Sequence, residues 1–479
     1  MQYGRLFSCK PSKALANTLI SWIGAQEYIY NSKVGEDRYY RTFARKYLPI
    51  GTYPEVNQQY SQFKGEDNQW LKTIPSQILR NGAVKWAQSY QRFFAKLGGR
   101  PKIQKKSSVK RAVWITKELF TFKERVSKDG VITHTILLGT KKNPVGELSF
   151  VAHTAYTVPN SIHISVRAGK WFVSFCNDMP DAIEPTDEEI TNHLKTFTSD
   201  ELSSLTIGID RGIVLPIAKS DCTSNDFSAA QRTRMVKKEL QKKRWQRIQA
   251  RRVKQSNRWK KACQRAAHYQ QYGVNVRKDF AHKVSYQLAN SQNILFGIEN
   301  LLIKNMTASA KGNVDNPGKR VAQKSGLNRS ILGAAWGQVG VYLSYKARRK
   351  GKLVVKVAPH HSSQECSGCG HTHPDNRQMQ SLFICQACGF TANADYNAAL
   401  VIKKRAIALV LSEEFTGKVN KKTITRKKVG QVMSELSVET PTTSQEVTHK
   451  ETLLDMDGKL LSMQSSANCE TPTISALAA

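Results

Sequence analysis

Hydrophobic residues in the first hundred positions recur at helical spacing. Between positions 75 and 98 they lie three or four residues apart, which places one set of apolar side chains on a single helix face: Leu79, Ala83, Trp86, Tyr90, Phe93 and Leu97. Pro75 and Ser76 mark the start of this helix, and Gly98 and Gly99 end it. We predict that residues 11 to about 100 are helical. The aromatic positions are more typical of a core face than of a surface on which bases stack.

The hydrophobic period changes to two farther along the chain. From about 112 to 175, apolar and polar residues alternate in three segments, at 131–138, 162–166 and 171–175. This alternation predicts a small antiparallel β domain, which we interpret as a barrel. An acidic stretch containing Asp187 and Glu188 follows it, and we interpret that stretch as a linker.

A third region begins near Leu202 and mixes strands with helices. The pattern predicts a strand pair at 205–218, strands at 294–303 and 353–357, and helices near 331–347 and 394–411. Such a mixture argues for a layered α/β domain. Beyond Gly430, seven acids and two lysines lie among many Ser and Thr residues, a composition typical of a disordered tail.

The charge balance narrows the class of partner. The 479 residues contain 73 Lys and Arg against 37 Asp and Glu, a formal net charge of +36, whereas the hydrophobic fraction of 40% is ordinary for a folded protein. A polyanion is the natural partner of such a chain, and nucleic acid is the commonest one. No run approaches the roughly 18 consecutive apolar residues of a membrane-spanning helix. No cleavage signature follows the N-terminal segment either, so we expect a protein that is neither inserted in a membrane nor exported.

Four of the nine cysteines form two CxxC pairs with fifteen residues between the pairs: Cys366, Cys369, Cys385 and Cys388. Four thiolates at this separation can surround one tetrahedral Zn²⁺, and a glycine after each second cysteine suits the tight turn of a zinc knuckle. The pattern therefore predicts a zinc ribbon. Because four cysteines close the coordination shell, we expect the zinc to be structural. His371 and His373 lie in the intervening loop and are not expected to be ligands.

Two acidic residues stand at the ends of apolar strands. Asp210 and Glu299 each follow a Gly-Ile pair. A buried carboxylate is costly, so it is normally paired, hydrogen-bonded or bound to metal; the alternative is that each acid ends its strand in solvent. Asp395 opens the last helix, where an Asp is most simply an N-cap. Taken together, three carboxylates on separate elements of an α/β domain fit a two-metal phosphodiesterase.

At these positions the chain resembles the TnpB family of transposon-encoded RNA-guided DNA endonucleases, to which compact type V CRISPR effectors are similar. The resemblance is carried by GIDRGI around Asp210, GIENL around Glu299, the CSGCG and CQACG knuckles, and ADYNAA around Asp395. It covers roughly residues 1–412 and is strongest from 205 to 407. Arg211 and Asn300 depart from the residues usual in the family, but neither replaces one of the acids.

The resemblance implies a multidomain α/β plus β protein: a RuvC-like nuclease of RNase H fold with a zinc-ribbon insertion, an N-terminal helical domain and a small β-barrel domain. The implied order is a first barrel strand (1–10), a helical recognition domain (11–105), the β-barrel domain (106–195), the first nuclease segment (196–359), the zinc ribbon (360–391), the second nuclease segment (392–412) and a disordered tail (413–479).

The resemblance also implies cofactors and partners. Asp210, Glu299 and Asp395 would hold two Mg²⁺ ions, and the cysteines one structural Zn²⁺. A guide RNA and a double-stranded DNA target would be bound in the cytoplasm, at the nucleoid. Arg329 matches a basic position near the family's catalytic centre, although an exposed arginine near a helix start is an equal alternative.

Residues 232–265 hold fifteen Lys or Arg against one acid, Glu239. A charge run is usually a solvated face, but this density favours contact with the backbone of an RNA or a heteroduplex. The basic residues expected to make the contact are Lys242, Lys243, Arg244, Arg247, Arg251, Arg252, Lys254 and Arg258. Trp245 and Trp259 lie fourteen residues apart, so on a continuous helix they would share a face and anchor it.

Two other functions fit some of the pattern. An RNA-guided DNA-binding protein that represses or targets without cutting would share these domains, but the complete set of three acids argues against it. A RuvC-like nuclease that needs no guide would share the acids, but it would not need the long N-terminal half. We therefore favour an RNA-guided DNA endonuclease with a two-metal mechanism.

Overall fold

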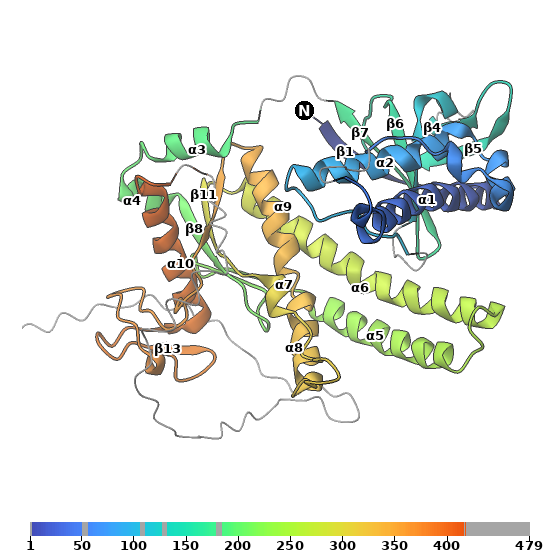
Figure 1. Ribbon diagram of the computed structural model, residues 1–479. Coiled ribbons are helices and arrows are strands. Elements are labelled where there is room, and N and C mark those ends of the chain that lie inside the picture. Colours follow the sequence, from blue (N-terminus) through green and yellow to red (C-terminus); the bar gives the residue numbers. More distant parts are fainter. Residues whose placement is uncertain are drawn as a thin grey trace, which may run out of the picture. The chain divides into compact units, whose positions relative to one another are not determined.

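The computed structural model describes residues 2–49, 56–105, 111–126, 132–178, 184–415 and 417 (Figure 1). By their contacts the residues group into two units, one of 1–183 with 234–273 and one of 184–233 with 274–479. The tail that we expect to be disordered lies outside the described residues, except for 413–415 and 417.

The first unit contains a seven-stranded antiparallel sheet with the order β2-β6-β7-β1-β5-β4-β3. Its strands are β1 (Gln2–Cys9), β2 (Arg111–Thr116), β3 (Phe120–Val126), β4 (Ile132–Gly139), β5 (Pro144–Val151), β6 (Ser161–Arg167) and β7 (Lys170–Asp178). β1 pairs with both β7 and β5, so the start of the chain completes the sheet that residues 111–178 build. β2 and β3 are its two edges, and within the described strands no pairing between them closes a barrel.

Two long helices of this unit, α1 (Lys13–Thr42) and α2 (Ser76–Phe94), share a core with the sheet. Leu19 and Leu79 from the helices belong to the same buried cluster as Phe7 and Ile136 from the strands. Four members of the α2 stripe are buried, which confirms its interpretation as a core face; they are Leu79, Ala83, Trp86 and Tyr90. Short 3₁₀ turns occur at η1 (Ala44–Lys46), η2 (Ser61–Phe63), η3 (Glu66–Thr73) and η4 (Lys117–Leu119).

The basic stretch forms two helices, α5 (Ala229–Ala250) and α6 (Asn257–Asn290), instead of one. A turn at residues 251–256 separates them, and Gln255 in this turn has a left-handed backbone with φ of 72°. Trp245 and Trp259 therefore lie on different helices, and the expectation that they share one helix face is wrong. α5 buries none of its residues, so no face of it is committed to a core.

The second unit is built on a mixed five-stranded sheet with the order β10-β9-β8-β11-β12. Its strands are β8 (Thr206–Asp210), β9 (Ile217–Lys219), β10 (Ser224–Asn225), β11 (Leu295–Glu299) and β12 (Leu353–Val357). β8, β11 and β12 are parallel, whereas β9 runs antiparallel to β8. Parallel strands covered on both faces read as nearly continuous apolar runs, which is the pattern at 205–209 and 294–298. The expected combination of an α/β region with a β region is confirmed.

Helices cover both faces of this sheet. The helices that lie wholly in this unit are α3 (Asp187–Leu194), α4 (Ser199–Ser204), α7 (Ile303–Met306), α8 (Val321–Gly333), α9 (Trp336–Arg348) and α10 (Ala394–Leu411). α10 lies against Gly208 and Gly297, and α9 approaches Ile298 of the opposite face through Gly340. Figure 1 shows α9 and α10 beside strands β8 and β11. None of the described helices is both long enough and apolar enough to span a bilayer.

The acidic stretch after residue 183 is more than a linker. It forms helix α3, which begins with a capping box in which the Thr186 hydroxyl accepts from the Glu189 N–H and the Glu189 carboxylate accepts from the Thr186 N–H. Ile190 and Leu194 of α3 are buried in the same cluster as residues of β11, β12 and α10. The acids of this segment therefore stabilise a helix start that the sheet unit uses in its core.

A small insertion separates β12 from α10. It contains the 3₁₀ turn η5 (Pro374–Asn376) and a two-stranded hairpin, β13 (Leu382–Ile384) with β14 (Thr391–Asn393). β14 runs directly into α10, so the insertion and the final helix are continuous.

Candidate functional site

Asp210 and Glu299 end two neighbouring parallel strands. β8 and β11 pair in register up to Ile209 opposite Ile298, so the acids take the next position of each strand at the same edge of the sheet. Gly208 and Gly297 face α10 two residues earlier, and side chains alternate along a strand. Both acids therefore lie on the side of the sheet that α10 covers.

The first turn of α10 brings the third acid to this edge. Asp395 is the second residue of the helix, and its charge acts on Asp210. Burial raises the pKa of Asp210 to about 7, helped by the charges of Glu299 and Asp395 and opposed by the Arg211 N–H and by Arg377. Burial also raises the pKa of Asp395, and Arg377 opposes this shift. The edge is thus a site where negative charge exceeds the nearby positive charge.

Asp395 is not the cap of its helix. The N-cap is Asn393, whose side-chain oxygen accepts from the Asp395 N–H at 3.0 Å and from the Tyr396 N–H at 3.3 Å. The capping alternative for Asp395 is therefore wrong. Its carboxylate is half-buried and accepts from Arg377 Nη2 at 3.4 Å, so it is free to bind a cation on its other side.

Glu299 is held at both its carboxylate and its main chain. Its side chain is 8% exposed, and Oε1 accepts a 2.6 Å hydrogen bond from Ser362 Oγ. Its main-chain carbonyl accepts from Arg211 Nη2. Burial lowers the pKa of Arg211, and the charges of Glu299 and Asp210 oppose this shift. Arg211, one of the departures from the family pattern, thus ties the ends of β8 and β11 together.

Sequence reasoning missed two residues at this site. Arg377 lies in the loop of the insertion, and Ser362 lies in the segment after β12; neither belongs to a motif, so only the fold brings them to the acids. Arg329, by contrast, is exposed on α8, and its side chain makes no ion pair or hydrogen bond in the described ranges. Its role near the centre stays a prediction.

The four cysteines converge in the insertion. Cys366 Sγ lies 3.7 Å from Cys388 Sγ, and Cys369 Sγ lies 3.6 Å from Cys385 Sγ. Four sulfurs at a Zn–S distance of about 2.3 Å in a tetrahedron are about 3.8 Å apart, so the spacing fits Zn²⁺. Among the described residues this is also the one group of three or more His, Cys, Asp or Glu with all ligand atoms within 4.8 Å of one another.

The backbone of each knuckle supports this assignment. Gly370 and Gly389 have φ of 79° and 70°, which confirms the reason for a glycine after each second cysteine. Burial raises the pKa of Cys385, but hydrogen bonds from the N–H groups of Cys388 and Ala387 and with the Cys388 and Cys369 thiols together outweigh burial and lower that pKa to about 7. His371 and His373 are exposed and stack on each other, outside the sulfur cluster.

The predicted nucleic-acid contacts lie on α5, the following turn and the start of α6. Seven of the eight basic residues are exposed and make no ion pair in the part of the chain that the structure describes: Lys243, Arg244, Arg247, Arg251, Arg252, Lys254 and Arg258. Lys242 pairs with Glu239 at 2.5 Å. These unpaired cations follow α5, which buries none of its residues, and continue through the turn to the start of α6, so they offer a suitable surface for phosphates.

Two family models match portions of the chain. Residues 182–310 match the model described as "Probable transposase" (OrfB_IS605), and residues 336–402 match the one described as "Cas12f1-like, TNB domain". The first match contains Asp210 and Glu299, and the second contains the four cysteines and Asp395.

Individual relatives agree with these models. The chain is 29% identical over 394 residues to "Putative RNA-guided DNA endonuclease InsQ" of Escherichia coli (strain K12), covering 82% of this chain and 89% of the relative. It is 46% identical over 69 residues to "CRISPR-associated endodeoxyribonuclease Cas12f1" of Sulfoacidibacillus thermotolerans, covering 14% and 16%. A solved Cas12f1–sgRNA–target DNA complex aligns over 80% of this chain and 82% of that chain, with 15% identity and a TM-score of 0.46.

Proposed function

The chain belongs to the TnpB-like family, and from this premise we propose that it is an RNA-guided DNA endonuclease with Asp210, Glu299 and Asp395 at its centre. The relative from E. coli, which is named for this activity, aligns over most of both chains. The mixed sheet with helices on both faces supports a RuvC-like fold for the region that carries the acids.

The convergence of three carboxylates from three elements is the observation that carries the proposal. Carboxylate oxygens are the ligands that Mg²⁺ prefers. Burial raises the pKa of Asp210, and the charges of Glu299 and Asp395 raise it further, as expected for acids that lie close together. We assign Asp210, Glu299 and Asp395 as ligands of two Mg²⁺ ions. Bound ions would supply activation of the attacking water and neutralise charge on the leaving oxygen.

The surrounding residues orient these ligands. Ser362 fixes one oxygen of Glu299, Arg211 fixes its main chain, and Arg377 fixes one side of Asp395. Arg377 is the cation closest to the acids by these contacts, and we propose it, ahead of the exposed Arg329, as the residue that stabilises negative charge on a bound phosphate. The four cysteines would hold one structural Zn²⁺.

The partners proposed are a guide RNA and a double-stranded DNA target. The exposed basic residues of α5 and α6 would contact phosphates of the RNA or of its duplex with DNA. Sequence would then be read by base pairing with the guide, which requires no base-specific side chains along the duplex.

The test is to purify the protein with the RNA it carries, sequence that RNA, and offer a matching DNA duplex in Mg²⁺. We expect the matching duplex to be cut and a mismatched duplex to remain intact. The variants Asp210→Asn, Glu299→Gln and Asp395→Asn should each bind the matching duplex without cutting it. Binding by the wild-type protein without cutting would overturn the proposal in favour of a targeting or repressor protein. Cutting without any RNA would overturn it in favour of a guide-independent nuclease.

A further inference from the structure

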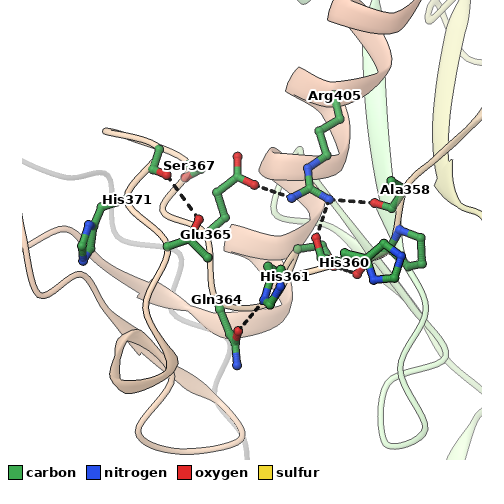
Figure 2. Close-up of polar contacts among 12 residues, drawn as sticks. Ala358, His360, His361, Gln364, Glu365, Ser367, His371 and Arg405 are labelled. Atoms are coloured by element: carbon green, nitrogen blue, oxygen red, sulfur yellow. Dashed lines mark hydrogen bonds and ion pairs between the residues drawn. The ribbon is translucent and has the colours of Figure 1, made fainter. Parts of the chain in front are cut away.

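The segment that joins β12 to the zinc ribbon is fastened to α10 by one arginine. Figure 2 shows Arg405 reaching from α10 toward the main chain of Ala358 and His360 and toward the Glu365 carboxylate. Arg405 Nη1 donates to the carbonyl oxygens of Ala358 and His360 at 2.7 and 2.8 Å, and Nη2 pairs with Glu365. A single planar guanidinium thus fixes both ends of the 358–365 segment.

The segment is also held from within. The His361 carbonyl accepts from the N–H groups of Gln364 and Glu365, both at 2.9 Å, and the His361 ring pairs with the Gln364 side chain at 2.9 Å (Figure 2). His361 has φ of 57°, a left-handed conformation that persists in a residue with a side chain only where its surroundings hold it. The segment is therefore a defined structure despite lacking helix or strand.

A second set of contacts from α10 holds the end of the segment that enters the ribbon. Asn397 Nδ2 donates to the Glu365 carbonyl at 2.7 Å, and Asn397 Oδ1 accepts from the Ser367 N–H at 2.9 Å. Lys404 donates to the Ser367 carbonyl. Asn397 is fully buried, so these bonds are shielded from water.

Ser362 lies in the middle of this segment and touches the nuclease centre. It is 5% exposed, and its hydroxyl lies 2.6 Å from Glu299 Oε1 and 3.2 Å from the Pro359 carbonyl. The hydroxyl donates to the carboxylate, which is the nearer of these two acceptors. The hydroxyl therefore fixes one oxygen of Glu299 and leaves the other to a cation.

We infer that Ser362 and Arg405 are positioning residues: Ser362 orients the Glu299 carboxylate, and Arg405 holds the 358–365 segment so that Ser362 stays in place. This inference rests on the proposed function for the role of Glu299. It follows that α10 determines the positions of two of the acids. Asp395 is part of α10 itself. Glu299 is connected to α10 indirectly, because Arg405 of α10 holds the 358–365 segment and Ser362 of this segment holds the Glu299 carboxylate.

The first experiment changes the hydroxyl. Ser362→Ala should slow single-turnover cleavage about 10- to 100-fold, the usual range for one hydrogen bond to a charged group, while affinity for the matching DNA stays unchanged. Ser362→Thr keeps the hydroxyl and should recover most of the rate. The matched control is Ser363→Ala, since the Ser363 side chain makes no hydrogen bond within the described residues and the variant should cut at the wild-type rate. Equal rates for Ser362→Ala and Ser363→Ala would overturn the inference.

The second experiment needs no nuclease activity. Arg405→Gln should speed hydrogen exchange at the amides of Gln364 and Glu365, because the segment loses its attachment to α10. Arg349→Gln is the control, since it removes an arginine that pairs with Glu184 elsewhere on the same unit. Exchange at these amides that is no faster in Arg405→Gln than in Arg349→Gln would overturn the inference, whether or not the wild-type protein cuts DNA.

The two experiments separate the possible failures. Faster exchange in Arg405→Gln, combined with a wild-type protein that cuts nothing, would support the attachment and refute the proposed function. Where the wild-type protein cuts, Arg405→Gln should lose rate as Ser362→Ala does, and the double variant should lose little more than either single one. If the two reductions in cleavage rate multiply in the double variant, Arg405 does not act through Ser362, and the inference is overturned.

Discussion

Gly208 and Gly297 are register partners on the adjacent parallel strands β8 and β11, and α10 crosses directly over both. A Cβ at position 208 would overlap the Ala399 carbonyl oxygen, and a Cβ at position 297 would lie 2.8 Å from the Ala406 Cβ. Each glycine comes two residues before an acid of the proposed centre. The close approach of the helix and the position of Asp395 therefore depend on the same pair.

The first prediction follows from this contact. Gly208→Ala should lower the free energy of unfolding by about 3 kcal/mol, and Gly297→Ala by about 1 to 2 kcal/mol, because backbone at position 399 yields less easily than a methyl group. Chemical denaturation of the purified variants measures both values. Gly326→Ala is the control, since its Cβ would meet nothing within 4 Å inside α8 and should be neutral or slightly stabilising. A Gly208→Ala variant as stable as this control would contradict the predicted clash.

The second prediction separates the helix cap from the proposed metal ligand. Asn393→Ala removes the side chain that accepts two N–H groups of α10 and should cost about 0.5 to 2 kcal/mol of stability. Cleavage should persist in that variant at a temperature where it is folded. Asp395→Ala should do the reverse, with little loss of melting temperature and no cleavage. Intact cleavage in Asp395→Ala would remove this residue from the centre.

The third prediction concerns pH. The pKa of Asp210 is about 7 in the folded chain and starts from 3.8, so between these values the folded protein binds a proton that the unfolded chain has released. The free energy of unfolding therefore falls as pH rises through this window. The Asn side chain of Asp210→Asn stays neutral, so the free energy of unfolding of this variant should not fall in this window. Between about pH 5.5 and 8 in Mg²⁺-free buffer, it should gain at most about 2 kcal/mol over the wild-type protein.

Melting temperatures of both proteins across this range measure the difference. It should shrink when Mg²⁺ is added, because a bound cation stabilises the ionised carboxylates of the wild-type protein. A difference that stays constant with pH would show that Asp210 does not titrate in the expected window.

The fourth prediction concerns the sulfur cluster. Cys385→Ser should remove most of the bound zinc and lower the melting temperature at the same time, because binding of structural zinc is coupled to folding. Zinc content by elemental analysis and melting temperature should be measured on the same preparation. Cys176→Ser is the control, since Cys176 is exposed and lies outside the ribbon, and it should keep one zinc per chain. Full zinc content in Cys385→Ser would contradict the assignment.

The fifth prediction concerns RNA affinity. Four cations of the α5–α6 region should be neutralised together, as Lys242→Gln, Lys243→Gln, Arg251→Gln and Arg252→Gln. The slope of log affinity against log salt should then become shallower by about 3, since each contact with a single-stranded phosphate contributes about 0.7. Filter binding at several salt concentrations measures this slope.

The control for this prediction neutralises four exposed lysines of the seven-stranded sheet unit: Lys123, Lys141, Lys142 and Lys170. Both quadruple variants carry the same net charge, so a general effect of charge would change them equally. Equal slopes for the two variants would therefore show that the α5–α6 cations are solvated and do not contact RNA phosphates.

Much of the proposed centre can be predicted from the sequence, because two of its acids follow short, strongly patterned strands. A Gly-Ile-acid ending after an apolar run specifies both a buried strand and its edge, so the sequence alone is enough to name Asp210 and Glu299. The four cysteines can also be predicted as zinc ligands from the sequence, because the spacing within each CxxC pair is a local property. Asp395 is ambiguous in the sequence, since the same position suits a cap, and Asn393 resolves the ambiguity only through its hydrogen bonds.

The rest depends on contacts between residues that are distant in the sequence. Ser362 meets Glu299 across 63 positions, and Arg405 meets Ala358 across 47, and no local pattern encodes either pair. The break between α5 and α6 is also hidden, because a uniformly basic stretch has no hydrophobic period whose phase could reveal a turn. The acids of α3 have the composition of a linker, because the charged first turn of a helix resembles a solvated segment in the sequence. Only the burial of Ile190 and Leu194 in the core shows that this segment is a helix of the sheet unit.

The zinc ribbon begins after Ser362 and ends at Asn393, so both of its junctions lie next to acids of the proposed centre. A chimaera that exchanged this ribbon for another would therefore disturb Glu299 at one junction and Asp395 at the other if it were cut at the outer limits of the insertion. Splicing points placed after Arg377 and before Asn393 would leave Ser362, Arg377 and Asn393 native. To exchange ribbons between such proteins, only the part of the insertion far from its junctions should be grafted, and the residues at both junctions should be retained.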